Sequence, residues 1–312
     1  MNERILVRVG QWYYLEGLTQ EAIARKMGTS RSTVSRLLSQ AHKLGIIKVD
    51  IATDVVRSFD VRLEHELERI FRLDEAVVVD SGASDPTPAV AQASMELLAR
   101  SITRGAVIGL SWGRSMAAVV DQSFPSEAAV SDLTIVALSG GLGSNQPHIM
   151  SNSLVMQLAG KLNARAVTLD APAIMQSRAA LQAMLQEPTI APVLSLGQSA
   201  QVAMVGIGAV GQFSTLTTLN YMDPSVLKTL VEMGAVGDIC SRFYTIDGTA
   251  LDTEIDHRTL GIDLPTLKSV PRVIAVAWGA EKAHAVLGAL RMGILDVLVT
   301  DRTTAQIILN FA

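Results

Sequence analysis

Apolar residues recur at helical spacing through the first 45 residues of the chain, and glycines interrupt the pattern. In the first stretch Ile5, Val9, Trp12 and Leu15 fall on one face, which predicts an amphipathic helix. Glycine accepts the left-handed conformation in which many helices end. The pattern therefore predicts three short helices, over 3–15, 19–28 and 29–44, which end at Gly17, Gly28 and Gly45. Thr19 is the predicted N-cap of the second helix, and Thr29 or Ser30 that of the third.

Two segments of different period follow. Residues 46–51 alternate between apolar and polar types, which predicts a strand that would form the wing of a winged helix-turn-helix. Residues 55–73 have the period of an amphipathic helix, with Phe59, Leu63 and Leu67 on its apolar face. Such a helix either packs on its own domain or serves as a linker or dimer seam between domains, and the pattern leaves both open.

From residue 76 onward, short apolar runs alternate with helical stretches. Strands that are buried on both faces of a parallel sheet read as near-continuous apolar runs. The alternation therefore predicts a doubly wound α/β domain with a largely parallel sheet. An irregular insert at 240–268, with a turn at Asp247 and Gly248, interrupts it. The predicted strands are 76–80, 106–111, 133–138, 166–169, 201–207, 272–277 and 296–300.

These patterns divide the chain into three parts: an N-terminal all-α, winged helix-turn-helix domain (1–52), a connector helix (53–73) and an α/β domain (74–312). Hydrophobic residues make up 49% of the chain and aromatic residues only 4%, so the core must be built from aliphatic side chains. The single cysteine, Cys240, excludes an internal disulfide and a zinc site of several cysteines. With no signal-peptide pattern and no apolar run of membrane length, we expect a soluble, cytoplasmic protein that does not bind membranes.

The charges are distributed unevenly. The whole chain has a formal net charge of −4, which by itself disfavours a nucleic-acid partner. Residues 1–50, however, carry eight basic and four acidic side chains, while the rest carries 18 basic and 26 acidic ones. A basic segment on an acidic remainder is typical of a module that binds phosphates and is attached to a domain of another function.

The segment TQEAIARKMGTSRSTVSRLL, residues 19–38, has the features of a helix-turn-helix. Ala24 supplies the small residue between the helices, Gly28 the turn, and Val34 and Leu37 the apolar anchors of the second helix, opposite Ile23. The second helix of such a motif enters the major groove of double-stranded DNA, where arginines bind guanine edges or phosphates. The exposed positions, and so the predicted DNA-binding residues, are Arg31, Ser32, Thr33, Ser35 and Arg36.

In the α/β domain, glycines and small polar residues follow several predicted strands. Ligands of such domains bind at the carboxyl ends of the strands, where helix N-termini present free N–H groups. Each glycine turn alone is equally well explained as a tight turn, but together they predict one crevice for an anion or a polyol. Lys282, at the start of a predicted helix, would add a cation for a phosphate. The predicted effector-binding residues are Ser111, Gly113, Gly140, Gly141, Asp238, Lys282 and Asp301.

The helix-turn-helix, the GLSWG segment at 109–113, SGGLG at 139–143, GAVGDI at 234–239, the 279–282 segment and the terminal LVTD together resemble the SorC family of sugar-sensing transcriptional regulators. The resemblance runs in order along essentially the whole chain. It implies an effector domain similar to ribose-5-phosphate isomerase and glucosamine-6-phosphate deaminase, used for binding rather than catalysis. It further implies a carbohydrate or polyol operon as target, a sugar or phosphosugar effector, and a dimer or tetramer on operator DNA. Two residues depart from the family pattern, Trp278 in place of a glycine and Arg302 where an acidic residue is frequent.

Two other functions compete with this interpretation. An isomerase- or deaminase-like enzyme with an appended DNA-binding domain would need a general base at the crevice, for which only Asp238 and Asp301 are candidates. The five histidines show no metal-ligand spacing and have no nucleophile beside them. A DNA-binding protein whose second domain only oligomerises would have no need of polar glycine turns. We therefore expect a regulator with no catalytic residues, no metal and no cofactor.

Overall fold

The structure is a computed structural model that describes residues 3–48, 58–125, 130–141, 146–211, 214–218 and 222–312. The chain forms two compact units, Met1–Val55 and Val56–Ala312, called the head and the body below. In the described residues, no helix combines the length and the apolar character that crossing a membrane requires.

The head is helical, as its spacing predicts. Its elements are α1 (Glu3–Gly10), a π-helical segment η1 (Gln11–Leu15), α2 (Gln20–Met27) and α3 (Arg31–Lys43). A small core of Val9, Ile23, Ala24, Val34 and Leu38 joins the three α-helices. The fold class of the head is thus confirmed, although its α-helices are shorter than the periodicity suggested.

The predicted wing strand is wrong over the part that the structure describes. Residues 46 and 47 form bends, and residue 48 has no regular secondary structure. The amides of Ile46 and Ile47 both donate hydrogen bonds to the carbonyl of Ala41. These bonds cap the C-terminal end of α3. The Ile47 side chain then covers Gly10 of α1 and joins the core of the head. Residues 49–51 of the predicted strand lie outside the described residues.

The body is built on a seven-stranded parallel sheet, which confirms the predicted α/β class. Its order is β1-β10-β9-β5-β2-β3-β4, and every pair is parallel. Each strand lies within two residues of its predicted position. The strands are β1 (Glu75–Val79), β2 (Val107–Leu110), β3 (Thr134–Ala137), β4 (Arg165–Val167), β5 (Val202–Gly206), β9 (Val273–Val276) and β10 (Val297–Asp301).

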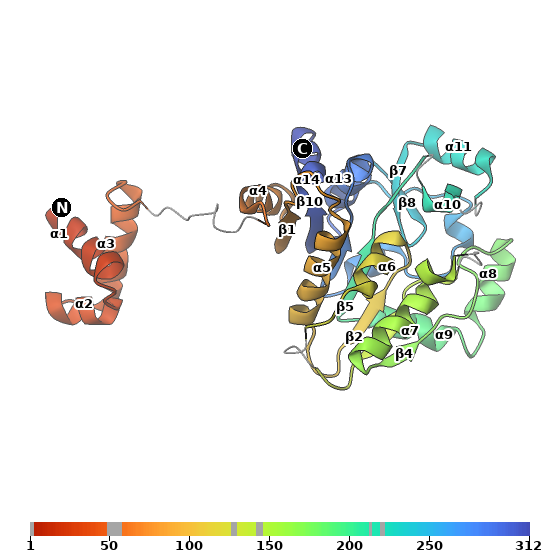
Figure 1. Ribbon diagram of the computed structural model, residues 1–312, viewed down its shortest axis with the longest axis horizontal. Coiled ribbons are helices and arrows are strands. Elements are labelled where there is room, and N and C mark those ends of the chain that lie inside the picture. Colours follow the sequence, from red (N-terminus) through yellow and green to blue (C-terminus); the bar gives the residue numbers. More distant parts are fainter. Residues whose placement is uncertain (1–2, 49–57, 126–129, 142–145, 212–213, 219–221) are drawn as a thin grey trace. The chain divides into compact units, whose positions relative to one another are not determined.

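Helices cover both faces of the sheet. Successive strand residues point to opposite faces, so Val77 and Val79 join one hydrophobic core while Ala76 and Val78 join the other. In Figure 1, α5 (Thr87–Ser101), α6 (Arg114–Asp121) and α7 (Ser151–Leu162) line one face, where they supply the first core. The second core is supplied by α4 (Val61–Phe71), α12 (Leu264–Lys268), α13 (Ala283–Met292) and α14 (Arg302–Asn310). The remaining helices of the body are α8 (Arg178–Leu185), α9 (Ala191–Gln198), α10 (Thr215–Thr218) and α11 (Pro224–Glu232).

Helix α4 lies in the segment expected to connect the domains. Its buried residues, Leu63 and Leu67, pack into the second core of the body. Asp60 caps its N-terminus by accepting a hydrogen bond from the Leu63 amide at 3.1 Å. The described helix begins at Val61 rather than at residue 55, and it is anchored on the body along its apolar face.

A second, smaller sheet was not predicted. It is antiparallel and consists of β6 (Gly208–Ala209), β7 (Ala235–Ile239) and β8 (Arg242–Thr245). The turn between β7 and β8 is formed by Cys240 and Ser241, both with positive φ. This sheet stands at the carboxyl end of β5 and closes one side of the crevice described next.

Candidate functional site

The head contains a helix-turn-helix formed by α2 and α3. Thr19 caps α2, since its hydroxyl accepts a hydrogen bond from the Ala22 amide at 3.2 Å. Gly28 ends the helix with φ +64°, a conformation that costs glycine little. Ser30 caps α3 by accepting from the Thr33 amide at 3.2 Å. The local chemistry of the sequence thus fixes both helix starts and the turn between them.

The orientation of α3 decides which of its residues are available to DNA. Val34, Leu38 and Ala41 are buried, whereas Leu37 is only half-buried, so Leu38 rather than Leu37 is the deeper anchor. The opposite face carries the predicted DNA-binding residues. Arg31, Ser32, Ser35 and Arg36 are exposed and Thr33 is half-buried.

Two of those hydroxyls already have partners in the free protein. The Ser30 hydroxyl lies 2.8 Å from that of Ser32 and 2.9 Å from that of Thr33. Both side chains therefore belong to the capping network of α3. Arg31 and Arg36 are the two cations among the predicted residues, and they are the strongest candidates for contacts with bases or phosphates.

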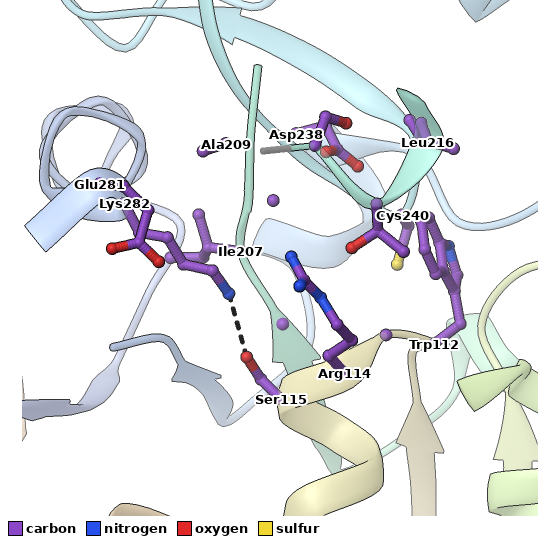
Figure 2. A pocket seen from close by; sticks show the side chains of 15 residues that line it. Trp112, Arg114, Ser115, Ile207, Ala209, Leu216, Asp238, Cys240, Glu281 and Lys282 are labelled. Carbon is purple, nitrogen blue, oxygen red and sulfur yellow. Dashed lines mark hydrogen bonds between the residues drawn. The ribbon is translucent and has the colours of Figure 1, made fainter. Parts of the chain in front are cut away.

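The body has a cleft at the carboxyl ends of its central strands (Figure 2). The start of α6, the segment after β5, the β7–β8 hairpin and the 3-10 helix η6 (Ala280–Lys282) surround it. Its cavity volume is about 50 Å³. The lining residues are 112–115, 206–209, 214–216, 238, 240, 281 and 282.

Lys282 brings a positive charge to this cleft. It is half-buried, and its Nζ lies 3.1 Å from the Ser115 hydroxyl and 5.9 Å from the centre of the Trp278 ring. Burial, followed by repulsion from the nearby Arg114, lowers the pKa of Lys282 from its usual 10.5 to about 8. Figure 2 shows the Arg114 guanidinium pointing into the same space. The cleft therefore holds two cations whose repulsion lowers the pKa of Lys282, and the carboxylates of Glu281 and Asp238 oppose that lowering.

Asp238 brings a buried carboxylate to the opposite wall. It lies on β7, is 5% exposed and accepts a hydrogen bond from the Ser241 amide at 3.1 Å. It packs against Gly208 so closely that no side chain would fit there. Burial raises the pKa of Asp238 to about 6, against the lowering effects of the Ser241 amide and of Lys282. A carboxylate in this state gains from hydroxyl donors.

Three of the seven predicted effector-binding residues line the cleft: Gly113, Asp238 and Lys282. Ser111 lies directly behind it, where its hydroxyl accepts from the Gly206 amide at 3.0 Å and ties β2 to the end of β5. Its side chain is buried and faces the strands rather than the cavity.

The other three predicted residues are engaged elsewhere in the described structure. The Gly140 amide donates to Leu260, and Gly141 pairs with the segment at 171–173. Asp301 caps α14 by accepting from the amides of Thr303 and Thr304. None of these three residues is among those that line the cleft.

Several residues that line the cleft were not among the predicted ones. Arg114 and Ser115 directly follow the GLSWG segment at the start of a helix, which was a usable signal for anion binding. Cys240 reaches the cleft only because the β7–β8 turn places it there. Burial, and after it the charge of Asp238, raises the pKa of the Cys240 thiol to about 12, so this cysteine is a neutral wall residue.

Comparisons with known proteins agree with this arrangement. Residues 57–310 match the family model described as "Putative sugar-binding domain", and residues 9–43 match that of sigma-70, region 4. The sorbitol operon regulator of Klebsiella pneumoniae is 32% identical over 311 residues, covering 98% of each chain. The deoxyribonucleoside regulator of Bacillus subtilis is 28% identical over 312 residues, covering 99% of this chain and 98% of the relative. The crystal structure of the full-length sorbitol operon regulator superimposes with a TM-score of 0.75, again over 98% of each chain.

Proposed function

Since this chain belongs to the SorC family of sugar-binding transcriptional regulators, we propose that it binds operator DNA through its head under the control of a carbohydrate effector. The effector is a sugar or phosphosugar, and the regulated genes are those of carbohydrate or polyol catabolism. The observation that carries the proposal is the cleft, in which two cations face a buried carboxylate beside the strand ends. The cytoplasm is the compartment in which such a protein meets DNA.

The chemistry of the cleft supports an effector with both an anionic and a hydroxylated part. Lys282, Arg114 and the start of α6 would receive a phosphate, since N–H groups at a helix N-terminus and nearby cations favour anions. Asp238 would accept hydrogen bonds from hydroxyl groups at the other end. Binding rather than turnover is the proposed role, and incubation with pentose and hexosamine phosphates should yield no product.

The cleft is formed by separate elements, since Arg114 lies on α6, Asp238 on β7 and Lys282 on η6. An effector that contacts all three residues would bind one arrangement of these elements better than another. Such a difference in affinity is the condition for shifting a conformational equilibrium.

A ligand screen tests the proposal. The full chain is heated in the presence of sugars, polyols and their phosphates, and its melting temperature is compared with that of the free protein. A compound that binds the folded state raises the melting temperature in proportion to its concentration over its Kd. We expect stabilisation by at least one phosphorylated sugar or polyol. Absence of stabilisation by every compound would contradict the effector cleft.

The recognition helix can be tested separately. Arg31→Ala and Arg36→Ala should each weaken binding to the operator by about 1–3 kcal/mol if the arginines contact bases. The melting temperature should stay the same, because both side chains are exposed. Fluorescence anisotropy at fixed salt measures the affinities, with Lys268→Met, an exposed cation of the body, as the control. Unchanged operator affinity in both arginine variants would mean that another surface binds DNA.

A further inference from the structure

The body begins with a short segment that is fastened to the edge of the sheet. Phe59 forms an antiparallel bridge with Val79 at the end of β1. The Asp60 amide donates to the carbonyl of Val78 at 2.8 Å, and the Asp80 amide donates to that of Ser58 at 3.0 Å. The foot of α4, defined here as residues 58–60, is therefore bridged to the edge strand β1, and it is the first described part of the body after the head.

Arg302 joins this foot to the end of β1. Its Nε lies 3.3 Å from an Asp60 carboxylate oxygen, and its Nη1 lies 2.6 Å from one of Asp80. The two carboxylates are only 14% and 24% exposed, so this ion cluster is partly shielded from water. After the Gly82 amide, Arg302 is a cause of the lowered pKa of Asp80.

The position of Arg302 is unfavourable for the helix that carries it. It is the first residue of α14, where the positive end of the helix dipole disfavours a cation. Exposed ion pairs contribute little stability in general. The Arg302 side chain is therefore better explained by its link to Asp60 and Asp80 than by a contribution to the stability of α14.

The same helix start is also tied to the effector cleft. Asp301, the neighbour of Arg302, accepts a hydrogen bond from the Gly279 amide at 3.0 Å through Oδ1. Gly279 directly precedes η6, the element that carries Lys282 into the cleft. Helix α14 packs against both η6 and α4. The start of α14 thus holds the residue that precedes η6 on one side and the foot of α4 on the other.

We propose that Arg302 couples the effector cleft to the foot of α4, from which the chain continues to the head. The inference rests on the proposed function, because it assigns a regulatory role to the same cleft. When the wall that carries Lys282 moves, Gly279 displaces the Asp301–Arg302 turn. The contacts of Arg302 with Asp60 and Asp80 then change, and with them the attachment of the foot to β1. Coupling of this kind is reciprocal, so the state of the foot also affects affinity in the cleft.

Hydrogen–deuterium exchange on the full chain tests this coupling without an identified effector. The readouts are the Asp60 and Asp80 amides, which hold the foot against β1. Lys282→Met perturbs the cleft by removing its half-buried cation. We expect it to slow exchange of both amides by about threefold, because it relaxes repulsion in the cleft. In an Arg302→Met background, Lys282→Met should change their exchange by less than about 1.5-fold.

The controls separate coupling from loss of local structure. Arg302→Met alone will speed exchange at the foot for structural reasons, so the decisive quantity is the response to Lys282→Met in the two backgrounds. Arg104→Met removes another exposed Arg–Asp pair, with Asp132, and should leave the response intact. An equal response with and without Arg302 would overturn the proposal.

Inorganic phosphate provides the second arm of the experiment. It should slow exchange of the Gly279–Lys282 amides in both backgrounds, but affect Asp60 and Asp80 only where Arg302 is present. Slowing at the foot without Arg302 would overturn the coupling. If phosphate protects no amide of the cleft in any variant, the proposal of an anionic effector site is contradicted. The comparison of Lys282→Met with and without Arg302 still tests the role of Arg302.

Discussion

A fragment limited to the head, residues 1–55, is expected to bind a palindromic operator at least about a hundredfold more weakly than the full chain. The head contains Arg31 and Arg36, the candidates for base contacts, yet one recognition helix covers only a few base pairs. Its modest net charge, with eight basic against five acidic side chains, also limits the number of phosphate contacts. Tight and specific binding therefore requires two heads, held one helical turn of DNA apart or a multiple of it by a symmetric dimer or tetramer of bodies.

The measurement combines sizing and titration. Light scattering gives the mass of the full chain and of the fragment, and anisotropy gives their affinities for the same operator at the same salt concentration. A half-site operator serves as the control, because the advantage of the full chain should vanish on it. A monomeric full chain, or a monomeric fragment of equal affinity, would refute the need for paired heads.

Pairing of the heads, if the experiment shows it, would also determine how an effector can act. The cleft lies entirely in the body, and no residue that lines it belongs to the head. An effector that binds two arrangements of the body with different affinity shifts the population between them. If the arrangements differ in the spacing of the heads, operator affinity changes without contact between effector and DNA. Arg302 is the proposed link in each body.

The strands of the body could be predicted from the sequence because their signal is local. Buried parallel strands are apolar runs, and each predicted run became a strand of the main sheet. The small antiparallel sheet had no such signal. Its β6 strand has two residues, and its hairpin turn uses Cys240 and Ser241 at positive φ rather than glycine or asparagine. The sequence therefore could not show which residues the hairpin brings to the cleft.

The glycines show why the candidate site could be predicted only in part. Gly113 lines the cleft, whereas Gly140 is required because the backbone of 171–172 passes too close for a side chain. Both follow a strand in the sequence, and only the three-dimensional packing distinguishes a ligand-facing turn from a crowded one. Asp301 presents the same ambiguity, since its carboxylate satisfies amides at the start of α14.

Lys282→Met is expected to lower affinity for a phosphorylated effector about tenfold to a hundredfold, since it removes a charge-assisted contact. The same substitution should stabilise the free protein at pH 7. Burial and Arg114 hold the pKa of Lys282 at about 8 instead of 10.5, so its protonated form is disfavoured in the folded state. Removing it should raise the free energy of unfolding by about 1–3 kcal/mol, less the contribution of its hydrogen bond to Ser115.

The pH dependence has a definite sign. Between pH 8 and 10.5 the unfolded chain binds the Lys282 proton and the folded chain does not, so the free energy of unfolding rises with pH in this window. Below pH 8 the full penalty is present and constant. Lys282→Met should therefore remove this rise with pH. The free energy of unfolding of the variant should exceed that of the wild type by the largest amount at neutral pH. Lys268→Met, at an exposed lysine, is the matched control and should leave the profile unchanged.

Denaturant unfolding at pH 7 and pH 10, together with calorimetry using the effector that the screen identifies, measures both effects. Lower stability of Lys282→Met at pH 7 would show that Lys282 is a structural residue whose hydrogen bond outweighs its burial. Unchanged effector affinity would place the anion elsewhere. Gain of stability together with loss of affinity is the combination expected of a cation that is placed to bind a ligand, because the carboxylates of Glu281 and Asp238 offset only part of the cost of its charge.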